Sequence, residues 1–161
     1  MTQAFIALGS NLQNPVSQIK SAFLAIEKIP QTKLIKQSSL YRTPPIGYAA
    51  ATVEKIPEVI NSVAEVDSQV SAHEILTIEY YAGRVRPYPN APRVLDCDLL
   101  LYGDTVMQTR ILTLPHPRMH TRGFVLLPLF EIAPQLNMPI HGKIAALINA
   151  DIQQGIQKIT S

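Results

Sequence analysis

The order of strand-like and helix-like segments is the feature of this sequence that most restricts its fold. Four segments have the apolar runs or the alternation of strands, namely 3–9, 32–43, 58–68 and 94–103. Two others have the pattern or the end signals of helices, namely 15–29 and 71–82, the second with Ser71 as its potential N-cap. The second and third strands follow one another with no helix between them. This predicts a largely antiparallel sheet with helices on one face.

The resulting β-α-β-β-α-β order predicts an α+β fold with a ferredoxin-like βαββαβ core. Beyond the core, the sequence predicts a short hairpin at 103–112 and additional C-terminal helices at 124–134 and 142–150. The first of these helices accommodates Pro128 near its start. A length of 161 residues is typical of one domain with its own core, so we expect 1–161 to form a single domain.

The composition argues against several functional classes. A net charge of +2 does not favour a nucleic acid as partner. No apolar run approaches the roughly 20 residues of a membrane span, and the first residues lack the basic region of a signal peptide. Cys97 is the only cysteine, which excludes an internal disulfide and agrees with a reducing compartment. We therefore expect a cytoplasmic monomer without membrane contact.

The basic residues are unevenly divided between arginine and lysine. Every arginine lies between Arg42 and Arg122, whereas no lysine occurs between Lys55 and Lys143. The guanidinium group of arginine grips phosphate or carboxylate with two hydrogen bonds, whereas the lysine ammonium group is a point charge. A segment that uses only arginine therefore indicates an anion site, with chance placement on a solvated surface as the alternative.

Two aspartates in the last predicted strand of the core form the clearest chemical pattern. Residues two apart in a strand lie on one face, so Asp96 and Asp98 share a side while Cys97 turns into the core with Leu95 and Leu99. Two like charges at that spacing repel each other unless a cation lies between them. Mg²⁺ suits such a place because it takes one or two carboxylates and fills its other positions with water and phosphate.

The alternative is that each aspartate forms a structural ion pair with a neighbouring arginine. The loop before the strand holds Arg84, Arg86 and Arg93, which is more positive charge than two carboxylates neutralise. This excess favours a further anion, so the pattern as a whole predicts a site for a metal and a polyphosphate. Neither the G-x-x-x-x-G-K-[ST] nor the G-x-G-x-x-G motif occurs, which argues against P-loop and dinucleotide-binding proteins.

Longer motifs around these residues resemble the 6-hydroxymethyl-7,8-dihydropterin pyrophosphokinase family. The resemblance is carried by APRVLDCDLLLYG at 91–103, PHPRMHTRGF at 115–124, FIALGSNL at 5–12 and LYRTPPIG at 40–47. It implies transfer of the β,γ-diphosphoryl group of ATP to the hydroxymethyl oxygen of a reduced pterin, with release of AMP, in the folate pathway. It also implies two Mg²⁺ ions as cofactors, held by Asp96 and Asp98.

The resemblance assigns roles to individual residues. The catalytic positions are Arg84, Arg93, Asp96 and Asp98. The ATP-binding positions are Glu79, Arg84, Arg86, Arg93, His116 and Arg122. The pterin-binding positions are Thr43, Pro44, Ile46, Asn61, Asp96 and Phe124. Two proline-rich loops, 43–57 and 84–92, would close over the nucleotide as lids.

Two of these residues also suit a flat heterocycle by their own chemistry. The carboxamide of Asn61 offers a donor and an acceptor, and the ring of Phe124 offers a stacking surface, with ordinary core positions as the alternative. The chain departs from the family pattern in having no tryptophan, in Val59 where an aromatic residue is usual, and in Arg110 one position early. Two other functions remain open: a ferredoxin-like nucleotide- or RNA-binding module without catalysis, which 6% aromatic residues disfavour, and an inactive nucleotide-binding relative.

Overall fold

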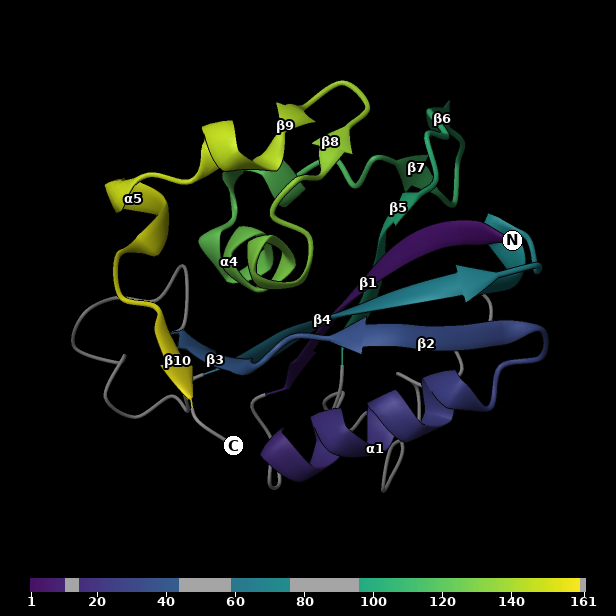
Figure 1. Cartoon of the computed structure of the whole chain (residues 1–161), viewed down its shortest axis with the longest axis horizontal. Coiled ribbons are helices and arrows are strands. Elements are labelled where there is room, and N and C mark those ends of the chain that lie inside the picture. The colour runs from purple at the N-terminus through teal and green to yellow at the C-terminus, as the bar shows by residue number, and fades with distance from the viewer. Residues whose placement is uncertain (11–14, 44–58, 76–95, 160–161) are drawn as a thin grey trace.

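The structure is a computed structural model that describes residues 1–10, 15–43, 59–75 and 96–159. Within these residues the main sheet has six strands. Five of them form a continuous row, and the sixth, β2 (Thr32–Gln37), pairs with β4. In spatial order these five are β10 (Gln157–Ile159), β3 (Leu40–Thr43), β4 (Val59–Ser68), β1 (Thr2–Ser10) and β5 (Asp96–Tyr102). Every strand pair is antiparallel. The order β5-β1-β4-β2/β3 is that of a ferredoxin-like sheet, which confirms the predicted α+β fold (Figure 1).

The strand predicted at 32–43 is interrupted. Its two parts, β2 and β3, pair with successive lengths of β4, and the break falls at Ser38 and Ser39. Ser38 stabilises the break because its Oγ accepts a hydrogen bond from the backbone N–H of Val63 at 2.9 Å and lies 2.8 Å from Ser62 Oγ. The backbone N–H of Ser38 still donates to the Val63 oxygen at 2.9 Å, so the backbone and the side chain of Ser38 together satisfy the polar groups of Val63 at the break.

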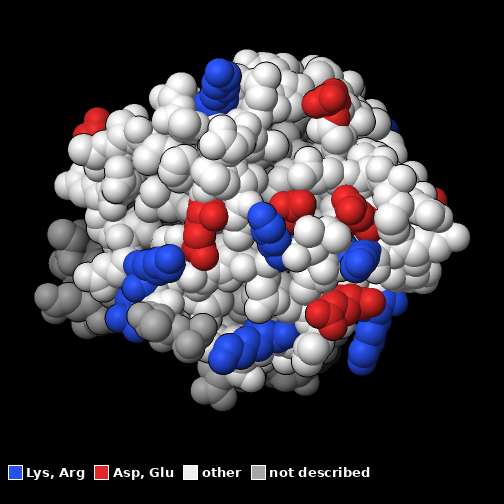
Figure 2. Space-filling model, viewed as in Figure 1, with Lys and Arg blue, Asp and Glu red and all other residues white. Residues whose placement is uncertain are grey.

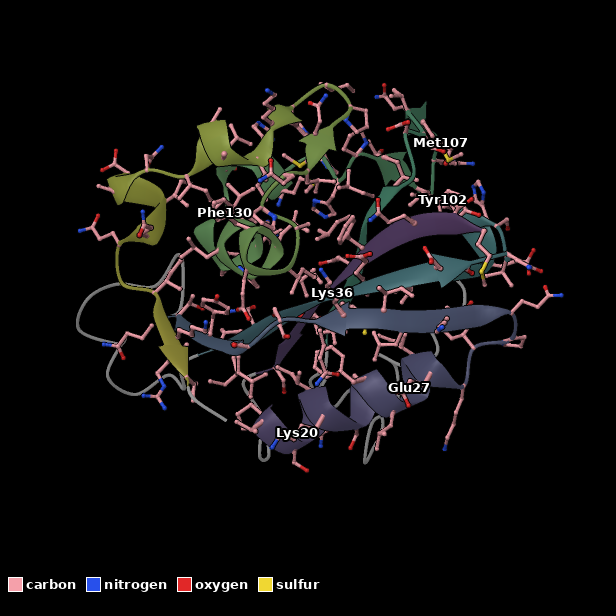
Figure 3. All side chains as sticks on the ribbon, in the orientation of Figure 1. Lys20, Glu27, Lys36, Tyr102, Met107 and Phe130 are labelled. Carbon is pink, nitrogen blue, oxygen red and sulfur yellow. The ribbon has the colours of Figure 1, made fainter. Side chains whose placement is uncertain are left out.

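Helix α1 (Pro15–Glu27) covers one face of the sheet. It buries Ile19, Phe23 and Ile26 against apolar residues of the strands, while Lys20 and Glu27 point away from the sheet (Figure 3). The helix predicted to begin at Ser71 has its first turn on the same side. Ser71 Oγ accepts the backbone N–H of Glu74 at 3.2 Å, which is the geometry of an N-cap, and residues 72–75 are helical. The remainder of that predicted helix lies outside the described residues.

Helix α4 (Gly123–Ile132) covers the opposite face (Figure 1). Within the described residues, the two helices of the predicted core share one face, as expected, and this additional C-terminal helix covers the other. Its apolar residues form a second core with η1 (Met119–Thr121), η2 (Ile144–Leu147) and the other side of β1, β4 and β5. Leu126 and Leu129 are fully buried there. The sheet therefore lies between two helical layers, because side chains alternate along each strand and supply apolar residues to both faces.

The C-terminal region differs from its prediction. The hairpin expected at 103–112 is confirmed as β6 (Met107–Gln108), although it pairs with β7 (Thr113–Leu114) just beyond that range. The helix expected at 142–150 is wrong. Gly142 has a φ of 77°, β9 (Gly142–Lys143) pairs with β8 (Asn137–Met138), and η2 follows. A new helix, α5 (Ala150–Gln153), starts where Asn149 Oδ1 accepts the N–H of Ile152.

Among the described residues, no helix has the length and apolar content needed to cross a membrane. On the face shown in Figure 2, acidic and basic side chains of the described residues are interspersed. That face therefore carries no extended patch of one sign of the kind that binds a nucleic-acid backbone.

Candidate active site

One pocket of about 250 Å³ opens between the sheet and the start of α4. Each predicted site residue that the structure describes lines it, namely Thr43, Asn61, Asp96, Asp98, His116, Arg122 and Phe124. They come from β3, β4, β5, the segment before η1 and the first turn of α4. Residues predicted for separate purposes in four parts of the sequence therefore meet around one space.

The two aspartates lie at the start of β5, in the part of the strand that is exposed. Asp96 and Asp98 are both exposed and line the same pocket, while Cys97 packs against the core on the α1 side. This confirms the predicted split between the faces of the strand, with Leu95 outside the described residues. The strand is not buried throughout. Its first three residues are exposed or half-buried, and full burial begins at Leu99. Among the described strands it lies at the edge of the sheet, beside β1.

His116 lies beside the carboxylates. A hydrogen bond from the backbone determines which ring nitrogen of His116 carries the proton. Its Nδ1 accepts the N–H of Arg118 at 3.2 Å, which puts the proton of the neutral ring on Nε2. Burial lowers the pKa of His116, and the nearby cations of Arg122 and Arg118 lower it further, against the opposing charge of Asp98. The ring is therefore neutral near pH 7 and can donate one hydrogen bond from Nε2.

His141 forms a hydrogen bond with the backbone of His116. Its ring stacks on that of His120 with centroids 4.2 Å apart and planes 17° from parallel. Burial lowers the pKa of His141, as does the charge of His120, while a hydrogen bond to the backbone of His116 opposes them. These contacts hold the two rings against each other next to the segment that carries His116.

Arg122 and Phe124 flank Gly123 at the start of α4. Arg122 is the N-cap residue, and its guanidinium carbon lies 5.5 Å from the centroid of the Phe124 ring. This is within the range of a cation–π contact. The pair places a positive charge and an apolar ring on neighbouring parts of the pocket wall.

Thr43 and Asn61 form a buried polar pair on the other side of the pocket. They are only 4% and 6% exposed. Asn61 Nδ2 donates to Thr43 Oγ1 at 2.9 Å, and Thr43 Oγ1 donates to the backbone oxygen of Val59 at 3.3 Å. The direction of these bonds fixes the carboxamide, so that its Oδ1 and its second N–H are the groups that can meet a ligand edge.

The two carboxylates fit a hard divalent cation with few protein ligands. Among the described residues, no group of three or more His, Cys, Asp and Glu side chains could hold a metal ion. A site closed by protein ligands alone is therefore not formed by this part of the chain. Two exposed carboxylates on one face match Mg²⁺, which keeps positions for water and phosphate.

Two residues near the site were not among the predicted site residues. Arg110 lines a groove of about 270 Å³ that also contacts Asp98 and His116, and its signal was its place in the arginine-only segment. Gly9 also lines the main pocket; the sequence left it open between a turn that donates backbone N–H groups and a plain strand end. Six predicted site residues lie outside the described residues, namely Pro44, Ile46, Glu79, Arg84, Arg86 and Arg93. So do almost all of the predicted lid at 43–57 and the whole of the one at 84–92.

Comparison with known proteins shows which family the chain belongs to. Residues 5–134 match the family described as 7,8-dihydro-6-hydroxymethylpterin-pyrophosphokinase (HPPK). The chain belongs to this family. The reaction is pyrophosphoryl transfer from ATP to hydroxymethyldihydropterin in folate biosynthesis, which confirms the function expected from the sequence motifs.

Relatives of similar length agree with this assignment. The chain is 41% identical over 152 residues to the 2-amino-4-hydroxy-6-hydroxymethyldihydropteridine pyrophosphokinase of Haemophilus influenzae, covering 92% of each protein. It is 37% identical over 161 residues to the enzyme of the same name from Pseudomonas aeruginosa, covering 98% of this chain and 96% of that protein.

Solved structures agree in fold. The HPPK-DHPS chain of Plasmodium falciparum superposes with a TM-score of 0.74 at 15% identity over 98% of this chain. This chain spans 47% of that one, about half its length. At this identity the likeness concerns the fold alone.

Proposed function

We propose that this pocket performs the transfer, with the pterin, the metal and the triphosphate held in adjoining parts of it. The observation that supports the proposal is the meeting of seven predicted side chains from separate parts of the sequence around one space. Strand register orders them. Asn61 pairs with Gly9 on β1, and Gly9 pairs on its other side with Asp96 on β5. A heterocycle edge held at Asn61 would therefore extend across β1 toward the carboxylates.

In this proposal the pterin ring lies against Phe124 and presents its edge to Asn61. The carboxamide is already held by Thr43, so little side-chain freedom is lost when the ligand binds. The aromatic ring and the buried amide differ in what they recognise, because the ring selects a flat surface and the amide selects a pattern of donors and acceptors. Pro44 and Ile46 would complete the pterin pocket.

We propose that Asp96 and Asp98 hold two Mg²⁺ ions in the working enzyme. Bound there, the ions would neutralise the triphosphate oxygens and favour attack at the β-phosphorus. The carboxylates are exposed at a strand end, so water and phosphate have access to them. Since Asp96 and Asp98 are both paired with residues of β1, the sheet fixes the spacing of their backbones.

His116 and Arg122 would contact the nucleotide beside the carboxylates. The Nε2–H of His116 can donate to a phosphate oxygen, and the fork of Arg122 can donate twice. Arg84 and Arg93 would add clamps during transfer, with Glu79 and Arg86 nearer the nucleoside. The described residues offer no evident general base, which suits phosphoryl transfer because positioning and charge stabilisation supply most of its rate.

The proposal is tested by an AMP-release assay with 6-hydroxymethyl-7,8-dihydropterin, with and without Mg²⁺. Release is expected only with both the pterin and the metal. Asp98→Ala should reduce turnover by at least about a hundredfold with an unchanged circular dichroism spectrum. The matched control is Asp104→Ala, which removes a carboxylate from the exposed turn after β5 and should leave turnover unchanged. Full activity of Asp98→Ala would refute the metal-binding role.

We also propose that the enzyme works in the cytoplasm as a monomer on small-molecule substrates, without a nucleic-acid partner. The predicted site residues in the described part surround one pocket within the fold of a single chain, which supports a monomer. Light scattering behind size exclusion should give the mass of one chain, 17.8 kDa. A dimer mass at working concentration would contradict this.

A further inference from the structure

Gly9 stands near the end of β1, where a glycine is unfavourable unless something requires it. Glycine in a strand costs folding free energy, because it loses more backbone freedom than other residues and has no side chain to pack. The described glycines with positive φ are Gly103, Gly142 and Gly155, and Gly9 is not among them. Its backbone is therefore one that any residue can adopt. The requirement must come from space rather than from conformation.

The register shows which space is kept open. Gly9 is paired directly with Asn61 on β4 and with Asp96 on β5. Paired residues in neighbouring strands point to the same face and lie about 4.8 Å apart. A side chain at position 9 would therefore project from the pocket floor between the residue proposed to hold the pterin edge and the one proposed to hold the metal.

The fold itself has room for a methyl group there. A Cβ on Gly9 would lie 3.0 Å from Asn61 Oδ1, 3.8 Å from Val59 Cγ1 and 3.9 Å from the backbone oxygen of Ile60. The tight contact is with the end of a side chain, which can move by a few tenths of an ångström. That movement would turn the carboxamide against its bond to Thr43. The methyl group would therefore weaken ligand binding at Asn61 and leave the stability of the sheet largely unchanged.

We propose that Gly9 determines the specificity of the pocket for a flat, fused two-ring heterocycle that carries a hydroxymethyl arm. This deepens the proposed function and rests on it. The bare backbone of Gly9 lets the ring lie flat across β1, with its amide edge at Asn61 and its arm toward Asp96. A methyl group at this position would lift the ring from the floor and turn the Asn61 carboxamide, while the carboxylates on β5 keep their place.

The experiment compares two glycine variants with opposite expected effects. Gly9→Ala should raise the KM and Kd of the pterin about tenfold or more, with the KM of ATP within about twofold and the melting temperature within about 2 °C of wild type. The matched control is Gly142→Ala. Gly142 has a φ of 77°, and no atom lies within 4 Å of the point that a Cβ would occupy, so alanine there strains the backbone without touching the pocket. It should lower the melting temperature and leave both KM values unchanged.

Three results would overturn the inference. They are an unchanged pterin KM in Gly9→Ala, an equal rise in the KM of ATP, and failure of Gly9→Ala to fold, since failure would mean that the sheet itself needs glycine. The wild-type enzyme separates this inference from the proposed function. Absence of Mg²⁺-dependent AMP release by wild type would refute the proposed function. Normal wild-type activity together with a wild-type pterin KM in Gly9→Ala would refute the role of Gly9 alone.

Discussion

Replacing Glu131 tests how the second helical layer is attached to the sheet. Glu131 lies near the end of α4 and accepts hydrogen bonds from Tyr41 OH at 2.6 Å, from the Ser39 N–H at 3.1 Å and from Ser39 Oγ at 2.9 Å. Lys158 Nζ on β10 lies 3.9 Å from the same carboxylate. One side chain thus connects α4 to β3 and to β10. Because β3 ends at Thr43 in the pocket, this contact also supports the site.

The loss expected for Glu131→Ala follows from the burial of the partners. Tyr41 is 7% exposed, so its hydroxyl would be left in the interior without its partner, at a cost of about 1–3 kcal/mol. Ser39 is half-buried and can bond to water instead, which adds about 0.5 kcal/mol. The sum is about 1.5–3.5 kcal/mol, or about 3–14 °C in melting temperature for a chain of this length.

Urea unfolding followed by circular dichroism measures this loss. Lys158→Ala is the control, because an ion pair at 3.9 Å with a side chain that is 57% exposed should contribute less than about 1 kcal/mol. In the background of Glu131→Ala, the change Tyr41→Phe should cost less than it does alone, since its partner is already gone. A loss below about 1 kcal/mol, or strictly additive effects of the two changes, would refute the reasoning.

The same network predicts a dependence on pH. Burial alone would raise the pKa of Glu131, but hydrogen bonds from Tyr41 and Ser39 and the charge of Lys158 together lower it. A carboxyl group with a lowered folded-state pKa stabilises the fold fully above its unfolded pKa of about 4.3 and loses this contribution as the pH falls through the folded value. The stability difference between wild type and Glu131→Gln should therefore be constant near neutral pH and shrink below about pH 4. A constant difference down to pH 3 would contradict this.

Three further changes test the pocket and its supports. Thr43→Val should leave Asn61 Nδ2 without its partner, lowering stability by about 1–3 kcal/mol in urea unfolding and raising the pterin KM; unchanged values of both would contradict the paired role. Phe124→Leu should weaken pterin binding in a fluorescence titration by about tenfold, with ATP binding unchanged, and equal weakening of both ligands would remove the stacking role. Ser71→Ala should lower stability by about 1 kcal/mol through loss of the cap on the Glu74 N–H, and an unchanged melting curve would show that the cap contributes nothing.

The strands of the sheet could be predicted because their apolar residues are buried in the structure, as the sequence pattern indicates. Residues 3–9 carry apolar side chains on both faces, and β4 has apolar residues among polar ones on each face; most residues of both strands are buried in the structure. The break at Ser38 could not be predicted, because two serines in a polar segment are equally compatible with a continuous strand and with an interrupted one. The helix at 142–150 was wrong because its apolar spacing suits a helix, while the left-handed backbone at Gly142 and the cap at Asn149 depend on neighbours that periodicity does not show.

The site was predicted where side chains carry chemistry. Asp96 and Asp98 are recognisable because two carboxylates on one face of a strand suit a cation, and the structure places them on one pocket wall. Asn61 is a polar residue inside an apolar strand, which indicates either a buried pair or a ligand contact, and here it lines the pocket while bonded to Thr43. Gly9 could not be found in this way, because its proposed contribution is the absence of a side chain.

Counting bound divalent ions tests the central claim most directly. Mn²⁺ can replace Mg²⁺ at oxygen ligands and is detected by electron paramagnetic resonance. With a nonhydrolysable ATP analogue, wild type should bind two Mn²⁺ ions per chain, and the double variant Asp96→Asn, Asp98→Asn should lose both, with an unchanged circular dichroism spectrum. Equal stoichiometry and affinity in the two proteins would show that these aspartates do not hold the metal.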